Sequence, residues 1–293
     1  MTGKDGLVIV DKPGGLTSHD VVARIRRLAG TKKVGHAGTL DPMATGVLVV
    51  GVEKATRLLG YLTLTEKQYD ATIRLGQATS TDDAEGEITA TASAKDVTPE
   101  ALAAAVSDLT GQIQQVPPAV SAIKVDGQRA YRLTRAGVAP ELKPRPVTVY
   151  EFTITDVRPA GDNLLDVDAT VRCSSGTYIR ALARDLGREL QAGGHLTRLR
   201  RTRVGGYDLG TAKTLDQLAD RFEVMPLARA AAAAFDRRDL SADEARRLSH
   251  GARLTATADA AKTTAAFAPD GTLIALLEER DGRARPLVVF VEG

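Results

Sequence analysis

Hydrophobic and polar positions follow two different periods along this chain, that of strands and that of helices. Short apolar or alternating stretches bounded by turn residues predict strands at 6–10, 67–76, 147–157 and 164–173. Apolar positions at helical spacing, with start and stop residues, predict helices at 19–29, near 54–60, at 99–109, at 176–190 and from Thr214 onward. The two patterns are mixed without a regular strand–helix–strand period, so the sequence predicts an α+β fold rather than a doubly wound sheet.

The segments between these elements carry boundary and loop signals. Ser18 is expected to cap the first helix and Gly30 to end it. The polar stretches 31–45 and 77–97 predict loops. Residues 116–146 contain five prolines and six basic residues, which indicates a largely irregular insertion.

The composition changes at about 213–240, where an alanine-rich stretch is expected to connect two domains. Beyond it, Ser241 and Glu244 form a capping-box pattern and Gly251 a helix stop. Two or three strands are expected after this helix, around a turn at 269–271. The sequence therefore predicts a catalytic domain over 1–235 and a small β-rich domain over 236–293. The small domain is too short to bury a large core and is expected to pack on its neighbour.

Composition narrows the class of protein. With 43% hydrophobic and 26% charged residues in 293, the chain is expected to be globular. No apolar run approaches the roughly 20 residues that span a bilayer, and the N-terminal stretch does not read as a signal peptide, so a soluble, cytoplasmic protein is expected. The single cysteine, Cys173, excludes an intrachain disulfide, and the four scattered histidines make a metal site improbable.

Charge is unevenly distributed although the formal net charge is only +2. Residues 1–60 contain nine Lys or Arg against five Asp or Glu, and residues 171–203 contain eight against two. Residues 76–110 contain one lysine against seven acids. Such a division favours a polyanionic partner on one face. Because there is no tryptophan and only 4% aromatic residues, phosphate and shape contacts are expected to dominate over base stacking.

One glycine-rich loop presents a candidate carboxylate. Asp41 lies between glycine-rich turns in GHAGTLDPMATGVL at 35–48, where a backbone rich in glycine can approach a ligand closely. Taken alone, Asp41 followed by Pro42 is better explained as an ordinary turn. The chain contains no phosphate-binding loop, dinucleotide fingerprint or metal-ligand cluster.

Several segments together resemble the bacterial tRNA pseudouridine-55 synthase family of the TruB type, in the family's order across about 220 residues. The strongest are VDKPGGLTSHD at 10–20, GHAGTLDPMATGVL at 35–48, KQYDATIRLG at 67–76 and CSSGTYIRALARDLG at 173–187. The resemblance implies a mixed, mainly antiparallel sheet with flanking helices. It also implies a thumb-like insertion over 116–146 and a PUA-like C-terminal domain.

The resemblance also implies an activity, the isomerisation of uridine to pseudouridine at position 55 in the T-loop of tRNA. The N1–C1′ bond breaks, the base turns, and a C5–C1′ bond forms, so no cofactor is expected. The uridine has to be extruded from the folded loop before either atom can be reached. Asp41 is implied to be the reacting carboxylate; the sequence leaves open whether it attacks sugar or base or abstracts a proton.

Site residues are transferred by the same resemblance. Arg180 is expected to pair with Asp41 and keep it ionised, and Tyr69 to stack on the base and handle its proton. The implied substrate-binding residues are His36, Tyr178, Leu199, Lys12 and Asp83, where His36 would enter the T-loop and Lys12 would also support the catalytic loop. Candidate RNA contacts are basic side chains near these motifs: Lys33, Arg129, Arg132, Arg198, Arg200 and Arg201. The expected partner is the T-arm of tRNA, bound by a monomer.

Three other interpretations are open from the sequence. A tRNA-folding chaperone with secondary catalysis would use the same basic segments and differ only at Asp41. An isomerase or hydrolase of free nucleosides is disfavoured, because a small neutral substrate needs no such positive field. A guide-RNA-directed relative is disfavoured because residues 77–146 match the stand-alone bacterial form better.

Overall fold

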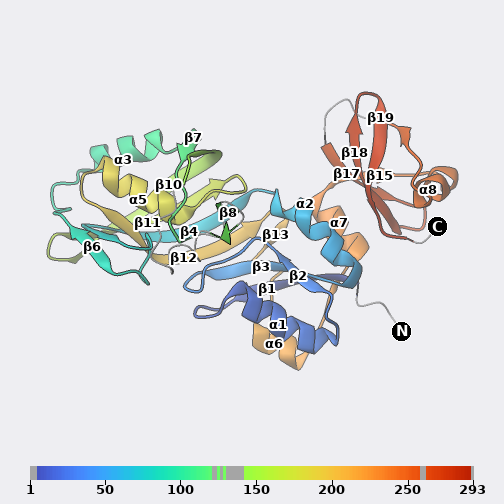
Figure 1. Ribbon diagram of the computed structural model, residues 1–293, viewed down its shortest axis with the longest axis horizontal. Coiled ribbons are helices and arrows are strands. Elements are labelled where there is room, and N and C mark those ends of the chain that lie inside the picture. The colour runs from blue at the N-terminus through green and yellow to red at the C-terminus, as the bar shows by residue number, and fades with distance from the viewer. Residues whose placement is uncertain (1–4, 121–123, 126–127, 130–141, 258–261, 292–293) are drawn as a thin grey trace.

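A long mixed sheet runs through the larger part of the molecule, and a smaller sheet stands at one end of it (Figure 1). The computed structural model describes residues 5–120, 124–125, 128–129, 142–257 and 262–291. The helices are α1 (Ser18–Ala29), the 3-10 helix η1 (Glu53–Leu58), α2 (Leu59–Thr63), α3 (Pro99–Asp108), α5 (Ile179–Glu189), α6 (Leu215–Asp220), α7 (Leu227–Ala234) and α8 (Ala242–Ser249). No helix in these residues is long and apolar enough to cross a membrane.

The main sheet is antiparallel except at one junction. Its order is β14 (Met225–Pro226), β1 (Gly6–Lys12), β3 (Thr45–Val52), β12 (Gly194–Val204), β4 (Lys67–Leu75), β11 (Leu164–Cys173), β10 (Arg145–Gly161) and β7 (Gly111–Gln115). β2 (Val34–Ala37) pairs with β3, and β13 (Tyr207–Asp208) pairs with β12. β3 and β12 run parallel, which joins two antiparallel halves at the centre. This mixed α+β architecture is the predicted fold class.

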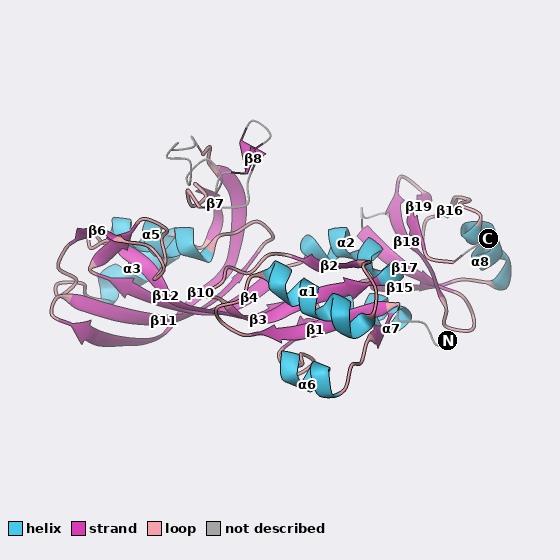
Figure 2. Cartoon of the chain, turned by 60° about the horizontal axis from the view of Figure 1, so that its bottom comes forward, coloured by secondary structure: helices cyan, strands magenta, loops and turns pink. Residues whose placement is uncertain are grey.

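The two halves of the sheet have different sequence patterns because they are covered differently. β1 and β3 are apolar along most of their length, and their apolar side chains enter one core cluster with α1 and a second with α2 and α7. In the other half, α3 and α5 cover one face, and the opposite face of β4, β11 and β10 has no described helix over it (Figure 2). A strand covered on one face only alternates between buried and polar positions, as β4 does.

Four local predictions need correction. The cap of α1 is Thr17, in a capping box with Asp20, because Ser18 is already the first helical residue and its hydroxyl is used elsewhere. The stretch 31–45 contains β2, and 77–97 contains the hairpin of β5 (Gln77–Thr79) and β6 (Ile88–Thr91). The helix expected at 176–190 begins only at Ile179. Most of the insertion at 116–146 lies outside the described residues, apart from its ends and the short pair β8 (Lys124–Val125) and β9 (Gln128–Arg129).

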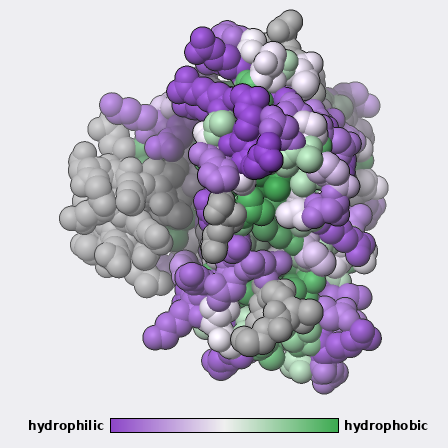
Figure 3. All heavy atoms as spheres, turned by 90° about the vertical axis from the view of Figure 1, so that its right-hand side faces the viewer, coloured by the Kyte–Doolittle hydropathy of each residue, from purple (hydrophilic) through white to green (hydrophobic). Residues whose placement is uncertain are grey.

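The smaller sheet has five strands, and four of them follow α8, where two or three were predicted. Its order is β15 (Asp236–Asp239), β17 (Lys262–Phe267), β18 (Leu273–Arg280), β19 (Arg283–Val289) and β16 (Leu254–Thr255). The predicted capping box of α8 is confirmed. Phe267, Leu276 and Phe290 share a core cluster with residues of β1, β3 and α7, so the small sheet packs on the larger part as expected. On the face that carries it, hydrophilic residues surround a central band of hydrophobic ones (Figure 3).

The parallel junction requires a glycine, which gives a test of the fold. Gly46 has φ +100°, and a Cβ there would lie 2.2 Å from the carbonyl oxygen of Arg201. Gly15 also has positive φ, but a Cβ there would meet nothing within 4 Å. We expect Gly46→Ala to lower the free energy of unfolding by ~3 kcal/mol or more, and the control Gly15→Ala by about 1 kcal/mol. Urea denaturation measures both, and equal losses would contradict this account of the junction.

Candidate active site

A pocket of ≈ 310 Å³ opens beside the junction of the two sheet halves. One wall is the loop between β2 and β3, which carries Asp41, and the opposite wall is the segment leading into α5. β4 and β12 contribute Tyr69 and Leu199. The pocket is lined by Gly38, Thr39, Leu40, Asp41, Thr63, Lys67, Tyr69, Ser174, Ser175, Gly176, Thr177, Tyr178, Ile179, Arg180, Leu199 and Arg201. Five of the predicted catalytic and substrate-binding residues are thus brought together.

Asp41 and Arg180 form an ion pair in this pocket. Nε of Arg180 donates to Oδ2 of Asp41 at 2.9 Å, and Nη2 donates to Oδ1 at 3.4 Å. The Arg180 side chain is 5% exposed, whereas that of Asp41 is 35% exposed. The carboxylate is therefore held in place by a buried cation while it remains open to the pocket.

Two further N–H groups of Arg180 donate to backbone carbonyls. Nη1 donates to the carbonyl of Thr81 and Nη2 to that of Val120, both at 2.8 Å. Nε lies 3.5 Å from Oδ2 of Asp83, which is 3% exposed. Arg180 thus joins Asp41 to the loop before β6 and to the start of the insertion. Asp83 was expected in the polar network around the site. It contacts Arg180 but is not among the residues that line the pocket.

Three buried polar side chains hold the loop around Asp41. Nζ of Lys12 donates to the carbonyls of Leu16 and Pro42 at 2.6 and 3.2 Å, and burial lowers the pKa of Lys12 to about 8. The Ser18 hydroxyl donates to the carbonyl of Leu40 at 3.1 Å and accepts from its N–H at 2.9 Å. A carboxylate whose supporting backbone is fixed in this way is preorganised for catalysis.

The third of these side chains is Arg201, which donates to the carbonyls of Gly38, Thr39 and Val47. It is 1% exposed, so its placement among the RNA-contacting residues is corrected to a supporting role in the pocket wall. Lys12 is likewise fully buried. Its placement among the substrate-binding residues is corrected for the same reason, while its expected support of the catalytic loop is present.

Tyr69, Leu199 and Tyr178 all reach the pocket as expected. Tyr69 is 8% exposed, and burial raises the pKa of its phenol, so the side chain is neutral at physiological pH. Tyr178 is held through its backbone: its N–H donates to Oε1 of Gln115, and its carbonyl accepts from Nε2 of the same amide.

His36 lies in β2, outside the residues that line the pocket. Its ring is 5.6 Å from that of His19 in an edge-to-face contact. Burial, with His19 as the next cause, lowers the pKa of His36, and its buried Nδ1 has no hydrogen-bond partner among the described residues. His36 is therefore a neutral imidazole with an unused ring nitrogen.

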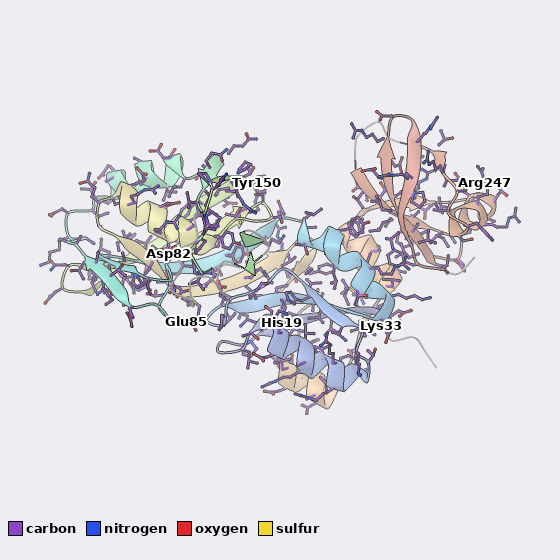
Figure 4. All side chains as sticks on the ribbon, viewed as in Figure 1. His19, Lys33, Asp82, Glu85, Tyr150 and Arg247 are labelled. Atoms are coloured by element: carbon purple, nitrogen blue, oxygen red, sulfur yellow. The ribbon has the colours of Figure 1, made fainter. Side chains whose placement is uncertain are left out.

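The candidate RNA contacts whose side chains the structure describes do not form one surface. Lys33 is exposed and lies beyond the end of α1, on the other side of that helix from Asp82 and Glu85 (Figure 4). Arg198 and Arg200 alternate with the inward-facing Leu199 and so point to the opposite face of the sheet, where Arg200 pairs with Asp11 at 2.7 Å. Arg132 and the side chain of Arg129 lie outside the described residues.

Sequence reasoning missed several residues that shape the site. Gln115 and Ser18 fix backbone groups of Tyr178 and Leu40, and a single buried amide or hydroxyl has no sequence signal that distinguishes it from a surface one. Lys67 lines the pocket, and a signal for it exists: it is a charged residue at an inward position of β4, two residues before Tyr69. No group of three or more His, Cys, Asp or Glu in the described ranges is arranged to hold a metal ion.

Family models and curated relatives match nearly the whole chain. Residues 26–179 match the N-terminal domain of the TruB family pseudouridylate synthases, residues 180–239 the tRNA pseudouridylate synthase B C-terminal domain, and residues 235–291 the C-terminal domain of tRNA pseudouridine synthase II. The chain is 64% identical over 290 residues to tRNA pseudouridine synthase B of Thermobifida fusca (strain YX), covering 98% of each. It is 56% identical over 286 residues to that of Mycobacterium ulcerans (strain Agy99), covering 97% of this chain and 94% of the relative.

Solved structures share the fold. A Cbf5–Nop10–Gar1 complex matches with a TM-score of 0.77 and 27% identity, covering 99% of this chain and 86% of the other. An H/ACA RNP bound to a substrate RNA containing 2′-deoxyuridine matches with a TM-score of 0.73 and 25% identity, covering 98% and 85%. The TruB family model covers more than half of this chain. Together with the curated relatives and the solved structures, this match shows that the chain belongs to the TruB family of pseudouridylate synthases.

Proposed function

We propose that this protein converts uridine 55 in the T-loop of tRNA to pseudouridine, with Asp41 as the reacting carboxylate and no cofactor. One observation carries the proposal: Asp41 is partly exposed at the pocket while a buried arginine binds both of its oxygens. Relatives named tRNA pseudouridine synthase B support tRNA as the substrate, and the matched RNP structure contains a bound substrate RNA.

The reaction is an isomerisation whose atoms balance within the nucleotide. The N1–C1′ bond breaks and its electron pair leaves with the base; the base turns, C5 bonds to C1′, C5 loses its proton and N1 gains one. Asp41 acts as nucleophile or base on the nucleoside. Arg180 keeps it ionised in a site with little water. Tyr69, neutral because burial raises the pKa of its phenol, stacks on the base and is placed to handle the proton.

The T-arm has to deform for this chemistry. A pocket of ≈ 310 Å³ admits a base but not a loop, so the uridine must be extruded, which costs a few kcal/mol of lost stacking. We propose that contacts to the T-arm offset this cost, with His36 next to the extruded nucleotide and Tyr178, Leu199 and Asp83 shaping or supporting the pocket. The acting form is a monomer.

We also propose two domains, a catalytic one over 1–235 containing the thumb-like insertion at 116–146, and a PUA-like one over 236–293. The five-stranded sheet that begins with Asp236 supports the boundary. In this arrangement the small domain extends the surface available to tRNA beyond the T-arm.

A position-specific assay tests the proposed activity. Purified protein is incubated with tRNA transcribed with 5-tritiated uridine, and release of tritium reports loss of the C5 proton. We expect one equivalent per tRNA, and none from a transcript in which uridine 55 is replaced by cytidine. Release that persists with the substituted transcript would reject the T-loop position, and no release from either would reject the activity.

A further inference from the structure

Lys67 is a buried cation at the pocket for which the catalytic scheme has no use. It is 6% exposed, and no carboxylate pairs with it in the described part of the chain. Its neighbour Glu66 is engaged by Arg172 and Arg203 instead. Burying an ammonium ion without a counter-ion is unfavourable, and burial lowers the pKa of Lys67 to about 8.

The backbone satisfies only part of this ammonium group. Nζ donates to the carbonyls of Thr63 and Thr65, at the end of α2. A lysine has three donors, so one N–H has no partner among the described residues. Lys67 lines the same pocket as Asp41 and lies on the same face of β4 as Tyr69, two residues away. The buried Arg201 also lines the pocket, and the Asp41 carboxylate there is paired with Arg180, so in the described residues neither Lys67 nor Arg201 forms an ion pair.

A uracil base supplies what this group lacks. Uracil carries two carbonyl oxygens that accept hydrogen bonds. Whatever the first step at Asp41, cleavage of N1–C1′ leaves an electron pair on the base, where it is delocalised over N1, O2 and O4. A preorganised donor aimed at developing charge in a site with little water stabilises the transition state strongly.

We propose that Lys67 recognises the extruded base: its free N–H donates to one carbonyl oxygen of uracil and stabilises the negative charge that the base acquires on leaving the sugar. This inference rests on the proposed function and adds a residue to it. A contact to O4 would also disfavour cytosine, which presents an amino donor at that position, whereas a contact to O2 would not distinguish the two bases.

The contact is tested by substituting Lys67 in the protein and one carbonyl oxygen of uracil in the RNA, separately and together. Single-turnover rates at saturating T-arm RNA are measured with uridine, 2-thiouridine or 4-thiouridine at the target position, because sulfur accepts hydrogen bonds more weakly than oxygen. For the wild type we expect one of the two thio-substituted substrates to react about tenfold more slowly than uridine. For Lys67→Met we expect the rate on uridine to fall about a hundredfold. The rate of this variant on the same thio-substituted substrate should be lower than its rate on uridine by less than about twofold. Lys67→Arg should recover most of the rate.

The controls separate this role from a structural one. If Lys67 only supports α2, Lys67→Met slows all three substrates by the same factor and leaves the thio effect intact, which overturns the proposal. Absence of any thio effect in the wild type also overturns it and needs no variant. If Lys67→Met fails to fold, as judged by its melting temperature, Lys67→Gln takes its place. Lys95→Met, at an exposed lysine, should match the wild type. Failure of the proposed function is seen separately, as no conversion of unmodified uridine by the wild type.

Discussion

Asp41→Asn is expected to abolish pseudouridine formation while tRNA affinity stays within about tenfold of the wild type, a difference of ~1.4 kcal/mol. The substitution keeps the size of the side chain and an oxygen that can accept from Arg180, but it removes the charge needed for a nucleophile or base. The supporting contacts from Lys12 and Ser18 end on backbone atoms, so they persist. The loop should therefore keep its shape while the chemistry is lost.

Two measurements on the same preparation check this expectation. Filter binding gives the dissociation constant for tRNA, and tritium release from 5-tritiated uridine gives turnover. Asp96→Asn, at an exposed aspartate, is the matched control and should leave both values unchanged. Turnover retained by Asp41→Asn would remove Asp41 from the mechanism. A chaperone role would be seen as tRNA folding that survives in this inactive variant.

Arg180→Met is the second large effect, with turnover expected to fall by at least about a hundredfold at neutral pH. The arginine contacts Asp41 and Asp83 and two backbone carbonyls, so its removal leaves two carboxylates near one another without the cation between them. Without the guanidinium, the Asp41 carboxylate also loses the two hydrogen bonds that orient it toward the pocket. Because this orientation matters for the chemical step, the single-turnover rate should fall much more than the affinity for tRNA.

A difference between the effect on rate and the effect on affinity distinguishes a role at Asp41 from general damage. Single-turnover rates at saturating RNA and dissociation constants for tRNA are measured for the variant and the wild type. Arg188→Met is the control, because Arg188 lies on the same helix but is 66% exposed. A defect in affinity alone, or equal losses of rate and affinity, would contradict the assigned role of the ion pair.

The parts of the fold that follow from local patterns could be predicted, and those that depend on distant packing could not. β1 could be placed because a short apolar run between turn residues has few other structures available. β2 was missed because it has only four residues, Val-Gly-His-Ala, which show no clear strand pattern. Its pairing with β3 decides its conformation. The cap of α1 was misplaced by one residue because Thr17 and Ser18 are both good caps. Only the buried contact of the Ser18 hydroxyl with Leu40 separates them.

At the site, residue types were predictable from the family motifs but orientations were not. Arg180 shares helical spacing with Arg184 and Arg188, so its pattern alone fits a solvated face. Its burial depends on a partner 139 residues away in the sequence. Arg198, Arg200 and Arg201 looked equivalent as basic residues on one strand. Alternation along β12 sends Arg201 to the opposite face of the sheet from Arg198 and Arg200.

The core that α7 shares with both sheets constrains how this protein can be shortened or recombined. α7 contacts β1 and η1 on one side and β17 and β18 on the other. Ending the chain after residue 235 would remove the apolar side chains of the small sheet that cover α7. The shortened protein would expose a hydrophobic surface and be prone to aggregate. A chimaera that exchanges the small domain between relatives would therefore have to carry α7 and its contact residues along with it.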